Sequence, residues 1–442
     1  MIFFTPGKFN LNTVMKNFFL VFTLFALITN IARGQGQTSK TSIFFEKVHL
    51  RTDRQVYLTG DNLWFSAFLV NAQDNRGIGT SNTLYVELSS ANKKKGAKRL
   101  IVKLDQGHGH GDFELDEQME SGTYILRAWT NWMRNFGTNF VFEKEIRIVA
   151  KPRKGEEGKD RKNNLNKKTT GVIETQAPHT AMRFLPEGGS LIEDVTSVVA
   201  FTTTSGTGVK GTIVNGKGEP VTNLESERGI GAFMFKPVAG ETYRVKGRLA
   251  NGSAFEQKLP AALAKGYGMY VVDKDSVYQI IISTNAASGQ IGKDVLLVGK
   301  SHGLNYFKTQ FTMQGKQQTV KVFKSSFPEG IASLTLYDNE GRPQCERLVY
   351  VEYKSKPVVR VINEKQSYLP DEKITVNLKL SDAEDRPLKG VFSIAALYDD
   401  LADPSQSDIR SYLMLESELK GKIESPKQYF DLRNVNRKKN LD

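Results

Sequence analysis

The residues best suited to bind a metal ion lie in the stretch GHGHGD, which ends at Asp112. His108 and His110 are two positions apart, and Asp112 follows two positions later. On an extended loop, two imidazoles at this spacing could reach one Zn²⁺ or Cu²⁺, with the Asp112 carboxylate as a third ligand. The remaining ligands would have to come from elsewhere in the fold. The alternative is a glycine-rich hairpin between two strands, and we therefore predict no bound metal and no cofactor.

Four aromatic residues are candidates for ligand binding, and these are Tyr57, Trp64, Trp129 and Trp132. Trp129 and Trp132 lie in the loop-like stretch WTNWMRNFG. Aromatic rings exposed on a β-sandwich can stack on sugar rings, because the ring face is apolar and flat. The alternative is packing in the core or at the rim of a domain end, where large aromatic residues are common.

The sequence lacks the motifs of common catalytic sites. Residues 206–211 (GTGVKG) match G-x-G-x-x-G, but a strand and a turn follow instead of the helix that a pyrophosphate site needs. No G-x-S-x-G, H-E-x-x-H or P-loop motif occurs. The single cysteine, Cys345, excludes an internal disulfide and is expected to be a small, half-buried residue at a strand entrance. We predict that the protein is not an enzyme.

The candidate residues lie among segments whose apolar alternation predicts β-strands. In LWFSAFLV, Leu63 and Phe65 point one way while Trp64 and Phe68 point the other, so this strand is expected to be buried on both sides for much of its length. Segments such as LYVEL, LIVKL, TYILRAW and FEKEIRIV follow, separated by turn-rich stretches. About seven short strands at this spacing, with no convincing helix, predict an antiparallel sandwich.

One phrase occurs twice in the chain. VHLRTDRQVYLTGDNLWF begins at Val48, and VRVINEKQSYLPDEKITV begins at Val359. Laid together without a gap, they place Tyr57 on Tyr368 and Leu63 on Ile374. A second device, a turn residue followed by a charge and a proline, recurs at residues 218–220, 341–343 and 385–387. These repeats predict copies of one domain type.

The fold class predicted from these patterns is all-β, with tandem antiparallel β-sandwich domains and a short C-terminal helix. The helix is expected within SQSDIRSYLMLESELKGKIESP, with Ser405 as its cap. The predicted division is a signal peptide (1–34), a sandwich (44–150), a charged flexible linker (151–178), two further sandwiches (180–272 and 275–353), and the start of another such domain plus the helix (357–442), which looks truncated.

The beginning of the chain predicts export. Lys16 precedes the apolar run FFLVFTLFALITNIA, and small and polar residues around Gly34 follow. This pattern is typical of a signal peptide, the alternative being a membrane anchor. The formal net charge of +13 is concentrated in the linker, where residues 151–168 hold eight Lys or Arg against three acidic residues, and in the basic C-terminal end. Nucleic acid is therefore not expected as a partner.

Several of these segments resemble a known family. Residues 52–57 (TDRQVY), with Gly60-Asp61 and Trp64-Phe65, resemble the signature of the macroglobulin-type domain of the α2-macroglobulin superfamily. Residues 121–124 (SGTY) and 327–351 are similar to other parts of such units. Thioester-containing members of that superfamily carry Gly-Cys-Gly-Glu-Gln, whereas Cys345 lies in PQCER, so covalent trapping of proteases is not expected.

The resemblance implies macroglobulin-like or immunoglobulin-like sandwiches and a role in binding. The layout is similar to a group of Bacteroidota envelope proteins in which macroglobulin-like units precede a segment similar to the plug of TonB-dependent receptors. It implies a non-enzymatic scaffold in the periplasm or at the outer membrane or cell surface of a Gram-negative bacterium, with a protein partner there and a role accessory to TonB-dependent uptake. The alternatives are a carbohydrate- or peptide-binding module and a protease trap without a thioester.

Overall fold

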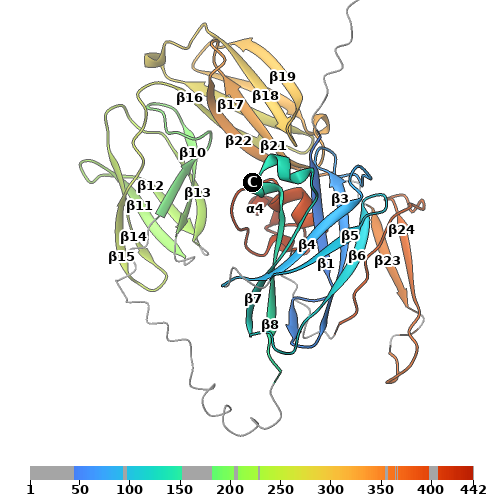
Figure 1. Ribbon diagram of the computed structural model, residues 1–442. Coiled ribbons are helices and arrows are strands. Elements are labelled where there is room, and N and C mark those ends of the chain that lie inside the picture. The colour runs from blue at the N-terminus through green and yellow to red at the C-terminus, as the bar shows by residue number, and fades with distance from the viewer. Residues whose placement is uncertain are drawn as a thin grey trace, which may run out of the picture. The chain divides into compact units, whose positions relative to one another are not determined.

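The computed structural model describes residues 44–92, 97–151, 182–203, 208–226, 229–353, 357–363, 365, 367–397 and 407–441. The predicted signal peptide lies outside the described residues, as does the predicted linker from residue 152 onward. In the described part, the named strands form antiparallel ladders except for β2 with β8, which run parallel (Figure 1). The all-β fold class predicted from the sequence is confirmed.

The first sandwich pairs a sheet of order β1-β3-β6 with one of order β2-β8-β7-β4-β5. Alternate side chains of each strand point between the sheets, where Leu50, Leu63 and Leu126 are fully buried. The strands are β1 (Glu46–Thr52), β2 (Val56–Leu58), β3 (Asn62–Asn71), β4 (Thr83–Ser90), β5 (Lys98–Lys103), β6 (His108–Glu114), β7 (Gly122–Trp129) and β8 (Phe142–Val149).

The second sandwich pairs the sheet β13-β10-β9 with the sheet β12-β11-β14-β15. Phe201, Ile213 and Val245 lie in the core that the two sheets share. The strands are β9 (Met182–Pro186), β10 (Ser197–Thr203), β11 (Val209–Asn215), β12 (Pro220–Ser226), β13 (Ile230–Phe235), β14 (Tyr243–Leu249) and β15 (Ala254–Lys258).

The third sandwich pairs the sheet β16-β17-β20 with the sheet β19-β18-β21-β22. Tyr278, Leu297 and Phe327 are buried between the two sheets, and Cys345 packs in the same core. The strands are β16 (Tyr267–Asp273), β17 (Val277–Thr284), β18 (Asp294–Ser301), β19 (Leu304–Thr312), β20 (Gln317–Phe323), β21 (Gly330–Tyr337) and β22 (Pro343–Val351).

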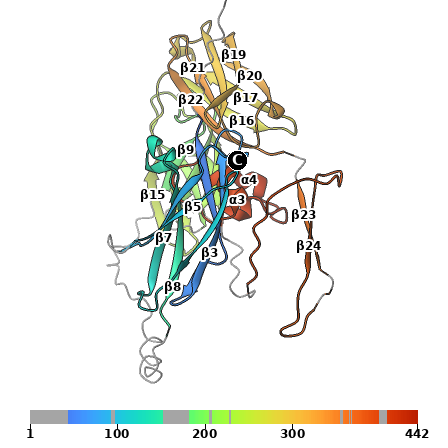
Figure 2. The ribbon, with the colours of Figure 1, turned by 45° about the vertical axis from the view of Figure 1, so that its right-hand side comes forward.

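The last strands form a sheet of only two, β23 (Val358–Asn363) and β24 (Val376–Ser381), which Figure 2 shows as a long hairpin. Helical turns follow, comprising α3 (Ile409–Ser411), which continues as a π-helical turn to Glu416, a 3₁₀ turn at Pro426–Tyr429, and α4 (Arg437–Leu441). The cap of α3 is Asp408, whose side chain accepts a hydrogen bond from the Ser411 N–H. The prediction that Ser405 caps this helix is therefore wrong, because Asp408 and Ser411 form a capping box three residues further on.

The repeated turn-charge-proline device forms one type of hairpin turn. In each copy the side-chain oxygen of an Asn or Asp accepts hydrogen bonds from the backbone N–H groups two and four residues later, at 2.9–3.1 Å, and these residues are Asn215, Asp338 and Asp382. The residue three positions on has a positive φ, at Gly218, Gly341 and Asp385. This local hydrogen bonding fixes the turn before the strand that follows it.

In the part of the chain that the structure describes, no helix has both the length and the apolar character needed to cross a membrane.

Candidate functional site

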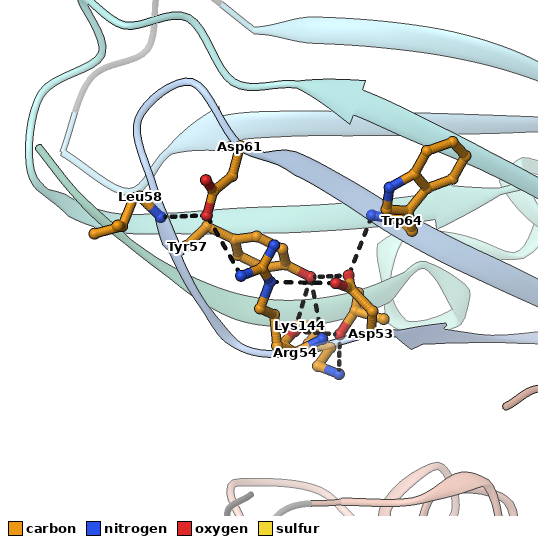
Figure 3. Close-up of polar contacts among 8 residues, drawn as sticks. Asp53, Arg54, Tyr57, Leu58, Asp61, Trp64 and Lys144 are labelled. Carbon is orange, nitrogen blue, oxygen red and sulfur yellow. Dashed lines mark hydrogen bonds and ion pairs between the residues drawn. The ribbon is translucent and has the colours of Figure 1, made fainter. Parts of the chain in front are cut away.

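The duplicated phrase forms a polar corner where the chain leaves β1 and enters β3 (Figure 3). The Tyr57 hydroxyl donates a hydrogen bond to Asp53 Oδ1 at 2.6 Å and accepts one from the Arg54 N–H at 3.3 Å. The same Asp53 oxygen accepts a hydrogen bond from the Trp64 N–H at 3.2 Å, so it ties the end of β1 to the start of β3. The Tyr57 side chain is only 1% exposed, and it holds the corner against the core.

Charged groups close the corner on its outer side. Arg54 Nε lies 3.2 Å from Asp53 Oδ2, and the Arg54 guanidinium also reaches Asp61 at 3.5 Å. This guanidinium lies over the Tyr57 ring, 4.9 Å from its centre. Burial, followed by the hydrogen bond to Asp53, raises the pKa of Tyr57 well above its ordinary value. The hydroxyl therefore stays protonated as a donor, and the corner is suited to holding strands together rather than to transferring protons.

The second copy of the phrase repeats several contacts of this corner. The Lys365 N–H donates to the Tyr368 hydroxyl at 3.2 Å, as the Arg54 N–H does to Tyr57. Lys365 pairs with Glu372 and lies over the Tyr368 ring, 5.7 Å from its centre. The strands agree as well, because Val48 pairs with Leu69 and Val359 pairs with Leu380, at the same separation along the chain. Two stretches of sequence with the same pattern therefore share their strand register and these local contacts.

The outer face of the sheet β1-β3-β6 carries an exposed tryptophan among polar side chains. Trp64 lies opposite Asp112 in the ladder between β3 and β6, and Ser66 lies opposite His110. Arg51 of β1 lies on the other side of Ser66. Side chains opposite one another on a sheet have Cβ atoms about 4.5–5.5 Å apart, so these residues are neighbours on one face. Ser393 Oγ donates a hydrogen bond to Ser66 Oγ at 3.0 Å on this face. The Trp64 side chain is 53% exposed, which is unusual for a residue with so large an apolar surface.

The predicted metal ligands lie on this outer face, but on a strand and not on a loop. His108, His110 and Asp112 alternate with glycines along β6, and the hairpin itself turns at Asp105–His108. His108 contacts the Phe68 ring edge-on, with ring centres 5.6 Å apart. Across the described residues, no three His, Cys, Asp or Glu side chains are placed to hold a metal ion.

Close packing explains the glycines of this stretch. A Cβ atom on Gly109 would lie 2.9 Å from a methyl carbon of Leu104, and one on Gly111 would lie 2.8 Å from the Phe65 ring. Real Cβ atoms do not approach other heavy atoms so closely, so β6 needs glycine at both inward positions. The alternation that suggested a loop in the sequence is instead the alternation of inward and outward residues on a strand.

The predicted binding tryptophans are half-buried. Trp129 packs against the core of the first sandwich and stacks on Tyr85, with ring centres 6.1 Å apart. Trp132 precedes a 3₁₀ turn and contacts Phe136 edge-on at 5.4 Å. The exposed aromatic residue is Trp64, another of the four candidates, although the alternation of its strand predicted burial on both sides for much of the strand's length. That interpretation was wrong at this end of β3, because Trp64 points to the outer face while Leu63 and Phe65 enter the core.

Two basic groups are buried beside β1. Burial, with the positive charges of Lys144 and Arg51, lowers the pKa of His49 to about 3. Burial, followed by the charge of Arg51, lowers the pKa of Lys144 to about 8. The Lys144 ammonium donates a hydrogen bond to Thr52 Oγ1 at 2.8 Å, and the ring of Tyr412 lies 5.5 Å from the His49 ring. Both groups therefore lose their proton at a lower pH in the folded protein than in the unfolded chain, which couples the protein's stability to pH.

Comparisons with known proteins give only distant similarities. No family profile matches the sequence, and no curated protein matches it either. Among solved structures, the chain is similar to a Salmonella α2-macroglobulin mutant (10% identity, TM-score 0.21), covering 76% of this chain and 25% of that one. It is also similar to Escherichia coli α2-macroglobulin activated by porcine elastase (11% identity, TM-score 0.25), covering 76% of this chain and 33% of that one. A third similarity is to dimeric latent PorU from Porphyromonas gingivalis (11% identity, TM-score 0.27), covering 70% of this chain and 34% of that one.

The chain thus spans about a third or less of the length of these proteins. Superpositions with TM-scores of 0.21–0.27 carry no argument about function. The fold class is established by the sheets themselves, and the chain is an all-β protein of antiparallel sandwiches that contains one strand-corner-strand unit twice.

Proposed function

We propose that this protein is an exported, non-enzymatic scaffold of macroglobulin-like sandwiches that binds a protein partner in a bacterial envelope. The observation that carries the proposal is the repeated corner, whose contacts at Tyr57 recur in part at Tyr368. Tandem modules of this kind present several rigid faces along one chain, which suits a protein that contacts other molecules. The apolar run before Gly34 supports export, and the resemblance to envelope proteins with a plug-like segment supports a role accessory to TonB-dependent uptake.

Export can be tested by expressing the whole chain in a Gram-negative bacterium and measuring the mass of the mature protein. The expected product is periplasmic or bound to the outer membrane, with its N-terminus near Gln35. Leu24→Arg, in the middle of the apolar run, should block processing and leave the protein in the cytosol. An unprocessed wild-type protein found in the cytosol would overturn the proposed location.

The partner can be sought by placing a photo-crosslinking amino acid at Trp64 and, separately, at Phe323, which is 60% exposed on the third sandwich. A specific adduct with one envelope protein in living cells supports the scaffold role, and recovery of a TonB-dependent receptor supports the accessory role. The same residue placed at Leu297, which is fully buried, serves as the control. Absence of an envelope adduct from both exposed positions contradicts a scaffold function.

A second candidate function is carbohydrate binding at Trp64. The observation that favours it is the exposed indole beside Asp112, His110 and Arg51, because a sugar ring can stack on the indole while its hydroxyls bond to the polar groups. Titration of tryptophan fluorescence with cello-, xylo- and chito-oligosaccharides should show a shift that is lost in Trp64→Ala and kept in Trp129→Phe. No shift with any of these sugars, or a shift that survives Trp64→Ala, excludes this function.

A further inference from the structure

The second sandwich exposes a basic surface on the outer side of the sheet β12-β11-β14-β15 (Figure 1). Ile213 of β11 and Val245 of β14 are fully buried on the inner side, so the residues next to them along each strand point outward. The outward charged residues of the four strands are five cations and two carboxylates, namely Lys210, Arg244, Lys246, Arg248, Lys258, Glu225 and Glu256. We call the surface formed by these residues the basic sheet face.

The strand register places like charges opposite one another on the basic sheet face. Lys210 of β11 lies opposite Arg248 of β14. Arg244 of β14 lies opposite Lys258 of β15. Like charges directly opposite one another destabilise a sheet, whereas opposite charges in these positions stabilise it. The register therefore favours a ligand that brings negative charge to this face.

The carboxylates of the face compensate only part of its positive charge. Three cations have a carboxylate within ion-pair distance, and these pairs are Lys210–Glu225, Arg244–Glu256 and Lys246–Glu256. Arg248 instead donates a hydrogen bond to the Gly252 carbonyl at 3.1 Å. Among the described residues, neither Arg248 nor Lys258 forms an ion pair. The strands of the other sheet of this sandwich contain one charged residue, Arg183 of β9, so the charge is concentrated on one side.

The arrangement of the cations suits a linear polymer with repeated negative charges. Arg244, Lys246 and Arg248 are two residues apart on β14, so they leave the strand in a row at intervals of about 6.4–6.8 Å. Such a row can contact several acidic groups along one chain. Beside it, Thr212 and Asn223 present a hydroxyl and an amide, which can hydrogen-bond to the hydroxyl groups of a sugar.

Other anionic partners match this face less closely. The centres of protein interfaces are enriched in aromatic residues and depleted in lysine, whereas the outward positions of this sheet include lysines and no aromatic residue. Stable attachment to a membrane surface usually combines basic residues with apolar groups that enter the lipid. The four strands expose one large apolar side chain, Val221, which is 46% exposed.

We propose that the basic sheet face binds a linear acidic polysaccharide, whose carboxylate or sulfate groups lie between the members of the two like-charged pairs. An anion between two cations replaces their repulsion by attraction to the ligand. The proposal adds a ligand to the scaffold function and concerns a different sandwich from the sugar site at Trp64. Its failure would therefore leave both of those functions unaffected.

Fluorescence anisotropy of a labelled galacturonic acid decamer, titrated with the purified full-length protein at low salt, tests the proposal. Saturable binding is expected, and it should weaken as salt is added because exposed charges are screened. Arg248→Glu should weaken binding by roughly fivefold or more, because an attraction becomes a repulsion. Arg183→Glu is the matched control, since it makes the same charge change on the other sheet of the same sandwich. Residues 151–168 are basic but identical in both variants.

Absence of binding by the wild-type protein, or equal effects of the two variants, would overturn the proposal. Competition against the labelled decamer tests the class of ligand. The unlabelled decamer should compete at a lower concentration of charge than poly-glutamate or phosphatidylglycerol vesicles, because it alone also offers sugar hydroxyls to Thr212 and Asn223. Its methyl ester, which has no charge, should not compete. Stronger competition by the polypeptide or the vesicles, or competition by the ester, would refute an acidic polysaccharide as the partner.

Amide hydrogen exchange locates the site without depending on a variant. In the wild-type protein, saturating decamer should slow exchange in β11 and β14 and leave the sheet β13-β10-β9 unchanged, because a ligand stabilises the strands it contacts against local opening. Arg248→Glu without ligand should also slow exchange in β11 and β14, since Lys210 then lies opposite a carboxylate. Exchange in β11 and β14 that the decamer does not slow would refute the location. Unchanged or faster exchange in Arg248→Glu would refute the repulsion on which the proposal rests.

Discussion

Removing one hydroxyl group from each copy of the duplicated corner should have very different consequences. Tyr57→Phe removes a hydrogen bond of 2.6 Å to the Asp53 carboxylate and leaves the Arg54 N–H without its side-chain acceptor. Hydrogen bonds to charged groups contribute about 1.5–3 kcal/mol when buried, so the first sandwich should lose about 2 kcal/mol of unfolding free energy. Tyr368→Phe removes a hydrogen bond of 3.2 Å from the Lys365 N–H at a half-buried site, and it should cost about 0.5 kcal/mol or less.

The chain offers a convenient probe of the first sandwich. All three of its tryptophans lie there, at Trp64, Trp129 and Trp132, so tryptophan fluorescence follows the unfolding of that sandwich within the full-length protein. With a urea m-value of about 1–2 kcal/mol/M for a domain of this size, the Tyr57→Phe midpoint should fall by about 1–2 M. The Tyr368→Phe midpoint by the same signal should be unchanged.

A midpoint shift of less than about 0.3 M for Tyr57→Phe, which corresponds to about 0.3–0.6 kcal/mol, would refute a stabilising hydrogen bond of this strength at the corner. Equal destabilisation of the fluorescent unit by the two variants would also refute it, because the corner in residues 365–372 would then be coupled to a sandwich from which it is separate in sequence. An unchanged m-value in each variant verifies that the comparison concerns stability and not the extent of unfolding.

Three further predictions concern ionisable groups. In the folded protein His49 stays neutral down to about pH 3, whereas in the unfolded chain its imidazole binds a proton below about pH 6.5. The free energy of unfolding should therefore fall by about 1.4 kcal/mol for each pH unit between these two values as the pH decreases. His49→Gln should remove that slope in urea titrations at pH 6.5, 5.5 and 4.5; an unaltered slope contradicts the burial of a neutral imidazole. Lys144, with a folded pKa of about 8, should make stability rise with pH between about 8 and 10.4, because the unfolded state then holds more protons, and Lys144→Met should lose this rise in the same assay. Burial raises the pKa of Cys345 to about 12, so a disulfide reagent at pH 8 should modify the thiol only after unfolding, and rapid modification of the native protein would refute this.

Much of the fold could be predicted because strand alternation and turn chemistry are local signals. The matched phrases at Val48 and Val359 predicted a shared unit, and the strand register agrees with the alignment residue by residue. The turn-charge-proline device was visible for the same reason, since an Asn or Asp side chain bonds to backbone groups only two and four residues away. Such patterns depend on interactions between residues only a few positions apart, so they can be recognised in the sequence without the tertiary structure.

The candidate surface could not be predicted in the same way. Whether an aromatic residue on a strand is buried depends on what covers its face of the sheet. Neither the exposure of Trp64 nor the stacking of Trp129 on Tyr85 can be predicted from the residues next to them in the sequence. The contrast between Leu50 at 0% and Val361 at 62% exposure makes the same point within one chain, because similar residues in the same register differ only in the sheet that faces them.

The inward and outward residues of strand β6 are under different structural constraints. Its inward residues, Gly109 and Gly111, cannot be replaced by larger residues, because an added Cβ atom would collide with Leu104 or with the ring of Phe65 and push the two sheets apart. Its outward residues, His110 and Asp112, lie on the opposite side of the strand from the core, so that replacing them should leave the interior unchanged. Substitutions along this strand should therefore be tolerated mainly at the outward positions, which are every second residue. New binding specificities can then arise on the outer face of the sandwich while its core stays unchanged.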